Sequence, residues 1–239
     1  MFAARCLLAV TLFAAPTCAT PQGDPLARAR ARMVSEQIES RGVRDSRTLE
    51  AMRKVPRHLF VTDRYRSDAY EDHPLPIGHG QTISQPYIVA FMTEALGLKG
   101  GERVLDVGTG SGYQAAVLAE IAARVYSIEI VAPLAEEARE RLMKLGYANV
   151  DVRAGDGYLG WPEAAPFDAI LVAAAAPRVP EPLRAQLREG GRLCIPVGEY
   201  AEGQELLLIE RRGDRFIERR LLPVRFVPMT GEVRDRPLP

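Results

Sequence analysis

The sequence predicts an α/β fold whose core is a doubly wound, mostly parallel sheet with antiparallel strands at its C-terminal end. Over residues 104–196, apolar stretches of strand length alternate with stretches of helical spacing. Such alternation is typical of a parallel sheet covered by helices on both faces. Two later strands, 205–211 and 215–223, flank the pair Gly213-Asp214, which favours a tight hairpin and therefore antiparallel pairing. A glycine-rich turn directly after the first core strand completes the pattern.

Two helices are expected before the sheet. The first spans 26–41 and ends at Gly42, since glycine readily adopts the left-handed backbone that stops a helix. The second is capped by Asp45 or Ser46 and ends at Pro56.

A loop over 73–86 is rich in Gly and Pro and is too long to be a simple connector. We expect it to close over a bound ligand as a lid. Helical spacing resumes over 87–96.

The core elements then follow in order. Strands are expected at 104–107, 124–130, 150–154, 167–173 and 192–196, the last after a Gly190-Gly191 turn, and helices at 114–123, 132–145 and 182–188.

Residues 104–113 predict a strand, a Gly-x-Gly turn and a helix N-terminus, which together form a nucleotide-binding corner. The dinucleotide fingerprint would place its third glycine one position later than Gly112, which follows Gly108 and Gly110. Asp106 comes just before this turn, where a carboxylate repels a pyrophosphate and attracts an ammonium group.

Two more acids follow the next two expected strands. Glu129 comes about 20 residues after the first glycine, a spacing suited to ribose hydroxyls in both NAD and S-adenosylmethionine. Asp156, within Gly155-Asp156-Gly157, can accept a hydrogen bond from an adenine amino group. Each acid alone could equally be a helix cap or a solvated charge. Three in succession, with no lysine near the turn, favour a cofactor without phosphate, namely S-adenosylmethionine.

Composition limits the function classes. The chain has 239 residues, which suits one domain with additions, and 31 basic residues balance 31 acidic ones, so no net charge favours nucleic acid. Of the three cysteines, Cys6 and Cys18 lie near the N-terminus and Cys194 stands alone. A disulfide framework and a cysteine-based zinc site are therefore excluded, and we expect no metal.

The first residues allow two interpretations. Residues 1–19 combine Arg5, an apolar run and small residues at 17–19, as in a short secretory signal peptide that is too short to be a stable membrane anchor. Alternatively they are an extension upstream of a true start at Met33. Residues 20–32 are expected to be a linker and the start of the first helix.

Six short motifs point to a known family. They are VPR at 55–57, LPIG at 75–78, GQTISQP at 80–86, DVGTGSGY at 106–113, GDG at 155–157 and VRFVP at 224–228. With them, the chain resembles the protein-L-isoaspartate (D-aspartate) O-methyltransferases over about residues 33–231. The QTIS loop is specific to this family, whereas the glycine turn is general to class I methyltransferases.

The resemblance implies a Rossmann-like class I methyltransferase in which residues 33–239 form a single domain. Residues 33–96 would supply N-terminal helices and the substrate or lid loop, and residues 97–239 the Rossmann-like core and C-terminal strands. The implied activity is transfer of the methyl group of S-adenosylmethionine to the α-carboxylate of L-isoaspartyl, and possibly D-aspartyl, residues in damaged proteins. The ester then cyclises to a succinimide that partly reopens as normal aspartate.

The resemblance also implies roles for individual residues. Ser84 is expected in catalysis, where its hydroxyl would aim the substrate carboxylate. Expected cofactor-binding residues are Asp106, Gly108, Thr109, Gly110, Glu129, Asp156 and Gly157. Expected substrate-binding residues are His79, Thr82, Ile83, Val227 and Pro228.

Three other functions remain to be weighed: a small-molecule O-methyltransferase on the same fold, a non-catalytic Rossmann-like binding module, and an NAD-dependent dehydrogenase. The QTIS loop, the three acids and the glycine spacing argue against them in that order. We expect isoaspartyl proteins and peptides as partners, a monomer, no nucleic acid and no stable membrane anchor. The family and the supply of cofactor indicate the cytoplasm, while the signal-peptide pattern makes export a serious alternative.

Overall fold

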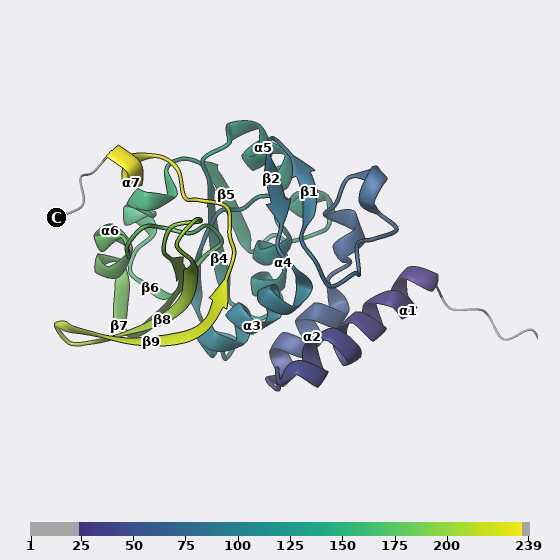
Figure 1. The fold of residues 1–239 in the computed structure, drawn as a ribbon, viewed down its shortest axis with the longest axis horizontal. Helices are drawn as coiled ribbons and strands as arrows, with labels where there is room; N and C mark the ends of the chain where they lie inside the picture. Colours follow the sequence, from purple (N-terminus) through teal and green to yellow (C-terminus); the bar gives the residue numbers. More distant parts are fainter. Residues whose placement is uncertain (1–23, 236–239) are drawn as a thin grey trace, which may run out of the picture.

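The computed structural model describes residues 24–235 (Figure 1). The proposed signal peptide or extension over 1–19, and residues 20–23 of the expected linker, lie outside the described residues. The helices are α1 Pro25–Arg32, α2 Ser46–Lys54, α3 Pro86–Leu96, α4 Tyr113–Ala119, α5 Ala132–Lys144, α6 Glu181–Ala185 and α7 Glu232–Asp235. The strands are β1 Leu75–Gly78, β2 Gln81–Ile83, β3 Arg103–Val107, β4 Arg124–Glu129, β5 Val150–Ala154, β6 Phe167–Val172, β7 Leu187–Val197, β8 Gln204–Arg212 and β9 Arg215–Val224.

The main sheet has the predicted architecture. Within the described residues, seven strands pair in the order β5-β4-β3-β6-β7-β8-β9. The pairs from β5 to β7 are parallel, and β8 and β9 are antiparallel to their neighbours. The chain runs outward from β3 to β4 and β5, then crosses back to β6 on the other side of β3. The ends of β3 and β6 therefore form a topological switch point, where ligands bind in open α/β sheets.

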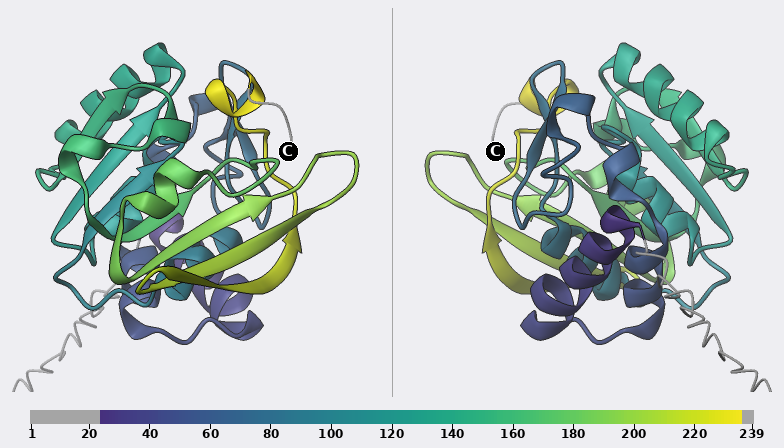
Figure 2. Two further views of the ribbon diagram at one scale, coloured as in Figure 1. Left: turned by 90° about the vertical axis from the view of Figure 1, so that its left-hand side faces the viewer. Right: turned by 90° about the vertical axis from the view of Figure 1, so that its right-hand side faces the viewer.

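Apolar side chains alternate between the two faces of the sheet. Val104 belongs to the core under α3, α4 and α5, and Leu105 belongs to the core under α6. Figure 2 shows helices on both sides of the twisted sheet. This double coverage explains why the central strands are almost continuously apolar in sequence.

The N-terminal helices agree with the sequence prediction. The expected helix over 26–41 is α1, which continues as a π-helical segment, Met33–Ile38, and one 3-10 turn before Gly42. Gly42 has φ 100°, the left-handed conformation that ends the helix. Asp45 caps α2 by accepting a hydrogen bond from the backbone N–H of Thr48 at 2.8 Å.

Two core boundaries differ from expectation. The predicted α4 reached residue 123 but ends at Ala119, and the predicted helix 182–188 ends at Ala185 because β7 already begins at Leu187, paired with Phe167. The expected Gly190-Gly191 turn is instead a bulge inside β7. A Cβ on Gly191 would lie 2.9–3.2 Å from three backbone carbonyl oxygens, so the bulge requires glycine at this position.

The Gly- and Pro-rich segment 73–86 is more regular than a loop. It contains a small antiparallel hairpin of β1 and β2, with Leu75 opposite Ile83. Three left-handed residues, Gly78, His79 and Gly80, make its turn.

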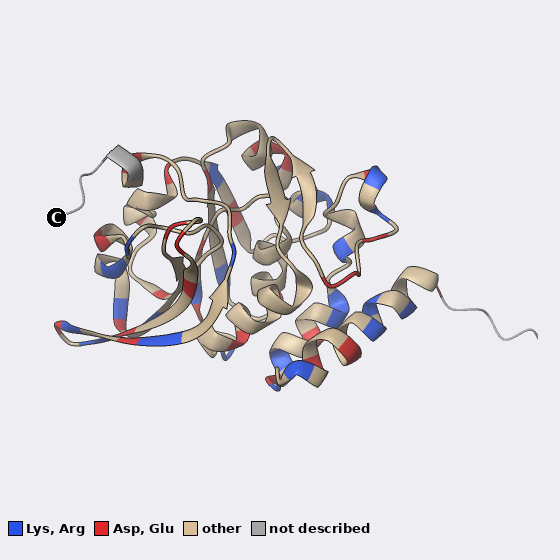
Figure 3. Cartoon of the chain, in the orientation of Figure 1, with Lys and Arg blue, Asp and Glu red and all other residues tan. Residues whose placement is uncertain are grey.

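Figure 3 shows basic and acidic residues interspersed along the chain. None of the helices in the described part of the chain is long and apolar enough to cross a membrane.

Two glycines with similar positive φ angles allow the effect of packing on stability to be compared. Gly112 (φ 89°) begins α4, and a Cβ there would lie 3.2 Å from Leu142 Cδ1, whereas Gly146 (φ 85°) has open space around it. We expect Gly146→Ala to lower the free energy of unfolding by roughly 1–2 kcal/mol through left-handed strain. Gly112→Ala should cost about 1–3 kcal/mol more, because Leu142 must move. Urea unfolding measures both, and equal losses would contradict the packing argument.

Candidate active site

A cleft opens at the carboxyl ends of the parallel strands. Its walls include the hairpin residues 81–84, the glycine turn 107–111, the end of β4 at 128–130, the C-terminal segment 227–230, and residues of α3 and α4. Gly157, Ala173 and Ala174 also line it. The cleft therefore lies at the topological switch point of the sheet.

The glycine turn requires its glycines. Gly108, Gly110 and Gly112 have φ angles of 93°, 52° and 89°, a region that other residues rarely adopt. Gly110 also lies close to the hairpin, since a Cβ there would be 3.2 Å from Ile77 Cδ1.

Backbone hydrogen bonds fasten this turn to β4. The N–H groups of Gly108 and Thr109 donate to the carbonyl of Ile128 at 2.9 and 3.3 Å. These two donors are thus already bound within the protein.

Glu129 lies at the end of β4 and lines the cleft. Its two carboxylate oxygens accept hydrogen bonds from Gly110 N–H at 2.8 Å and Val131 N–H at 3.0 Å. Each carboxylate oxygen has a second lone pair that stays available to a ligand hydroxyl. Among the described residues that line the cleft, Glu129 carries the only charged side chain.

Asp106 is fully buried behind the cleft and is not among the residues that line it. Its Oδ2 accepts a hydrogen bond from Ser127 Oγ at 2.7 Å, while its Oδ1 has no partner within the described residues. Burial raises the pKa of the Asp106 carboxyl to about 7, the hydrogen bond from Ser127 opposes this, and the charge of Glu129 adds to the rise.

Asp156 also lies outside the lining of the cleft. Its Oδ1 accepts from Tyr158 N–H at 2.9 Å and its Oδ2 from Glu232 N–H at 2.8 Å. The carboxylate therefore joins the end of β5 to the C-terminal helix α7. Its neighbour Gly157 does line the cleft and has no room for a side chain, since a Cβ would lie 2.4 Å from Val107 Cγ1.

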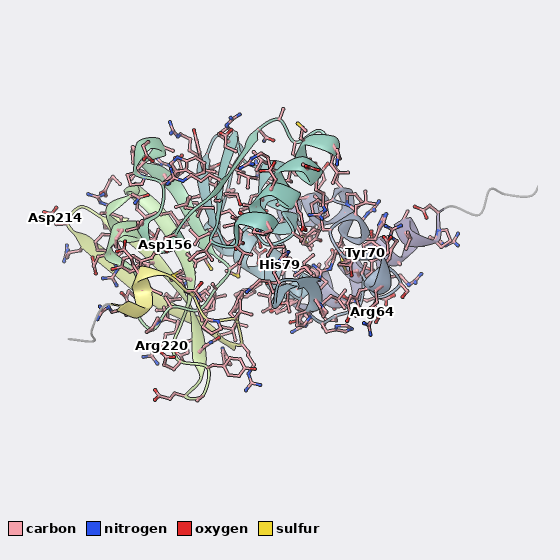
Figure 4. All side chains as sticks on the ribbon, turned by 90° about the horizontal axis from the view of Figure 1, so that it is seen from above. Arg64, Tyr70, His79, Asp156, Asp214 and Arg220 are labelled. Atoms are coloured by element: carbon pink, nitrogen blue, oxygen red, sulfur yellow. The ribbon has the colours of Figure 1, made fainter. Side chains whose placement is uncertain are left out.

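The hairpin brings Thr82, Ile83 and Ser84 to the cleft. Ser84 is half-buried at the end of the hairpin, and α3 begins without a side-chain cap, so the Ser84 hydroxyl does not serve as a helix cap. His79 lies at the hairpin tip instead, exposed and 3.6 Å from Glu137 of α5. Figure 4 shows His79 and Asp156 on different parts of the fold.

The C-terminal segment is held by backbone pairing with the loop after β6. Ala175 N–H donates to the Val227 carbonyl at 2.9 Å, and Met229 N–H donates to the Ala175 carbonyl at 2.7 Å. This pairing brings Val227 and Pro228 to the cleft, more than 50 residues after the loop that binds them.

Several residues of this site were missed from the sequence. Ile130, Ala173, Ala174, Met229 and Thr230 line the cleft as well. Ala173 and Ala174 could have been predicted from the sequence, because they are small residues directly after the apolar strand β6, and a ligand at a strand end needs space. Ser127 lies inside β4, and no motif around it in the sequence predicted a role in this site.

The described residues contain no group of three His, Cys, Asp or Glu side chains placed to hold a metal ion. The residues that line the cleft supply backbone groups, hydroxyls, the side-chain amides of Gln81 and Gln114, apolar side chains and one acid.

The sheet order and this cleft are those of a Rossmann-like class I methyltransferase. The protein-family model described as protein-L-isoaspartate(D-aspartate) O-methyltransferase matches residues 28–234 of this chain. The chain belongs to this family.

Individual relatives agree with this assignment. The chain is 61% identical over 203 residues to the protein-L-isoaspartate O-methyltransferase of Opitutus terrae, covering 85% of this chain and 87% of that one. A solved protein-L-isoaspartate O-methyltransferase superposes with a TM-score of 0.79 at 33% identity, covering 85% of this chain and 67% of that one. A Plasmodium falciparum protein, described as a putative enzyme of this kind in complex with S-adenosyl-L-homocysteine, has a TM-score of 0.71 at 28% identity and covers 84% and 98%.

The buried Asp106 predicts a dependence of stability on pH. Its folded pKa of about 7 lies above the reference value of 3.8, so the folded state binds more protons than the unfolded chain between these values. The carboxyl therefore lowers the free energy of unfolding as the pH rises through this window. In urea unfolding at a series of pH values, the stability of Asp106→Asn minus that of the wild type should rise by a few kcal/mol and then level off above pH 7. A pH-independent difference would show that the carboxyl is not perturbed.

Proposed function

We propose that this chain methylates the α-carboxylate of L-isoaspartyl residues in proteins and peptides, with S-adenosylmethionine as the methyl donor. Membership of the family supports the activity. The observation that carries the choice of cofactor is the charge of the cleft, whose described lining includes Glu129 and no lysine or arginine. A pyrophosphate would lack a counter-charge there, whereas a sulfonium cofactor without phosphate suits it.

Particular residues are proposed to hold the cofactor. Glu129 retains lone pairs for ribose hydroxyls, and Gly108, Gly110 and Gly157 let a ligand approach the backbone closely. The exposed Ile130 next to Glu129 offers an apolar surface for the adenine ring. Asp156 is proposed to act on the cofactor only through the backbone that it fixes around Gly157, because its side chain is not among the residues that line the cleft.

The reaction requires little acid–base catalysis from the protein. When bound, S-adenosylmethionine supplies an activated methyl group on a positively charged sulfur. The substrate carboxylate has a reference pKa near 4 and is already ionised at neutral pH, so no general base is required. The task of the protein is to hold one carboxylate oxygen in line with the methyl group and to exclude water.

Ser84 is proposed to orient that carboxylate. Ser84 lines the cleft and its hydroxyl does not cap α3, so the hydroxyl is proposed to donate a hydrogen bond to the anion. Thr82, Ile83, Val227 and Pro228 line the same cleft from two sides and are proposed to contact the polypeptide around the isoaspartyl residue. His79 lies at the hairpin tip and is proposed to contact substrate only beyond the cleft.

The direct test uses a peptide pair. Purified protein is incubated with S-adenosylmethionine labelled in its methyl group and either an isoaspartyl peptide or the same peptide with normal aspartate. We expect a base-labile methyl ester on the isoaspartyl peptide alone. Binding of S-adenosylhomocysteine without methylation of that peptide would overturn the proposed substrate and would leave the small-molecule methyltransferase as the better alternative.

Ser84→Ala tests the catalytic role. Loss of a hydrogen bond to a charged acceptor should lower kcat/KM for the isoaspartyl peptide by about 10- to 100-fold, which corresponds to roughly 1.5–3 kcal/mol. Calorimetry should find an unchanged affinity for S-adenosylhomocysteine. Ser67→Ala, at an exposed serine outside the cleft, is the control and should leave both values as in the wild type. An equal loss of cofactor affinity in Ser84→Ala would contradict the assignment.

We further propose that the protein acts as a monomer in the cytoplasm, where S-adenosylmethionine is made. Light scattering of the purified protein tests the first statement. Mass spectrometry of the N-terminus of the protein isolated from its own cells tests the second, and a chain that begins at Thr20 would overturn it.

A further inference from the structure

A line of three buried side chains connects Asp106 to the wall of the cleft. Asp106 and Ser127 are direct neighbours in the parallel pair β3 and β4. Ser127 Oγ lies 2.7 Å from Asp106 Oδ2 and 2.6 Å from Thr109 Oγ1. All three residues are at most 3% exposed, and of the three only Thr109 lines the cleft.

When Asp106 is ionised, hydrogen counting determines the direction of these bonds. An ionised carboxylate has no hydrogen, so Ser127 must donate its single hydroxyl hydrogen to Asp106. Ser127 can then only accept from Thr109, and Thr109 must donate its own hydrogen to Ser127. No hydrogen remains on Thr109 Oγ1, which therefore offers lone pairs alone to any further partner.

We propose that Asp106 orients the hydroxyls of Ser127 and Thr109, an arrangement that we call the relay. Thr109 Oγ1 is thereby a fixed acceptor for the ammonium group of the methionine portion of S-adenosylmethionine. Ser127 is then a positioning residue, since it acts on the cofactor through Thr109. This inference rests on the proposed cofactor. It also changes the role expected for Asp106 from the sequence, which was direct attraction of that ammonium group.

The remaining contacts of Asp106 support the relay. Its second oxygen, Oδ1, has no hydrogen-bond partner within the described residues, so the carboxylate is incompletely compensated in the protein alone. Glu129 lies nearby and raises the pKa of Asp106 further. A cation in the cleft would relieve both effects, because it attracts the charge of Asp106 as well as that of Glu129.

The test compares two ligands that differ in the amino-acid portion. S-adenosylhomocysteine carries the ammonium group, and 5′-methylthioadenosine lacks it while keeping the nucleoside and the sulfur. By calorimetry, Thr109→Val should bind S-adenosylhomocysteine about 10-fold or more weakly, as expected for loss of a hydrogen bond to a charged group. Its affinity for 5′-methylthioadenosine should stay unchanged, and Thr109→Ser, which keeps the hydroxyl, should restore wild-type binding of both ligands.

Ser127→Ala should also weaken binding of S-adenosylhomocysteine and leave binding of 5′-methylthioadenosine unchanged, but the loss of affinity should be smaller. Thr109 keeps its hydroxyl in this variant, although the hydroxyl is no longer held in one orientation. In kinetics, KM for S-adenosylmethionine should rise in Ser127→Ala while KM for the isoaspartyl peptide does not change. Thr48→Val is the matched control. Thr48 is 1% exposed and its hydroxyl donates to Asp45 Oδ2 at 2.8 Å, outside the cleft, so this variant should bind both ligands as the wild type does.

Two results would overturn the relay. One is an unchanged affinity of Thr109→Val for S-adenosylhomocysteine, and the other is an equal loss of affinity for both ligands in that variant. Should Ser127→Ala fail to fold, the pair Thr109→Val and Thr109→Ser decides the question alone. Failure of the proposed function is a different result, in which the wild type itself does not bind S-adenosylhomocysteine.

Discussion

The site depends on how the end of β3 is fastened to the end of β4. Two backbone N–H groups of the glycine turn bind the carbonyl of Ile128, and a third binds the carboxylate of Glu129. Three left-handed glycines make this path possible. Because the turn is fixed by its neighbour strand, a cofactor meets a surface that is already in place, and little ordering is needed on binding.

The rest of the cleft is assembled around this junction from distant parts of the chain. The β1–β2 hairpin closes one side through Ile77, which packs close to Gly110. On the other side, Ala175 holds Val227 and Met229 by backbone hydrogen bonds. Asp156 ties the end of β5 to α7 through Glu232 N–H. These contacts are made by backbone groups, by the buried Ile77 and by the half-buried Asp156, none of which lines the cleft with its side chain, so substitutions in the cleft itself can change binding without removing its supports.

The sequence was a good guide to regular elements and a weaker guide to irregular ones. Strand β5 has the predicted bounds, and Gly42 ends its helix in the left-handed conformation as predicted. These signals are local, because β5 alternates apolar and polar residues, as a half-exposed strand does, and a helix end needs a special backbone angle. The bulge in β7 and the short hairpin over 75–83 were not predicted. The bulge depends on pairing with a distant strand, as in the contact of Leu187 with Phe167. The hairpin pairs locally, but its strands are short and contain Pro76 and Gly78, which are typical of loops.

By itself, the sequence determined the fold class and the position of the cofactor turn through the spacing of glycines, acids and apolar residues, and it indicated the family through the resemblance of its six motifs. Only the tertiary structure decided which side chains share the cleft. All three acids lie at or just beyond the ends of parallel strands, yet Asp106 is fully buried against Ser127 and Asp156 connects β5 to α7, so Glu129 alone of the three lines the cleft. The physical reason is that register between neighbouring strands and the closure of the C-terminal segment set the direction of each carboxylate, and neither can be derived from the residues of one strand.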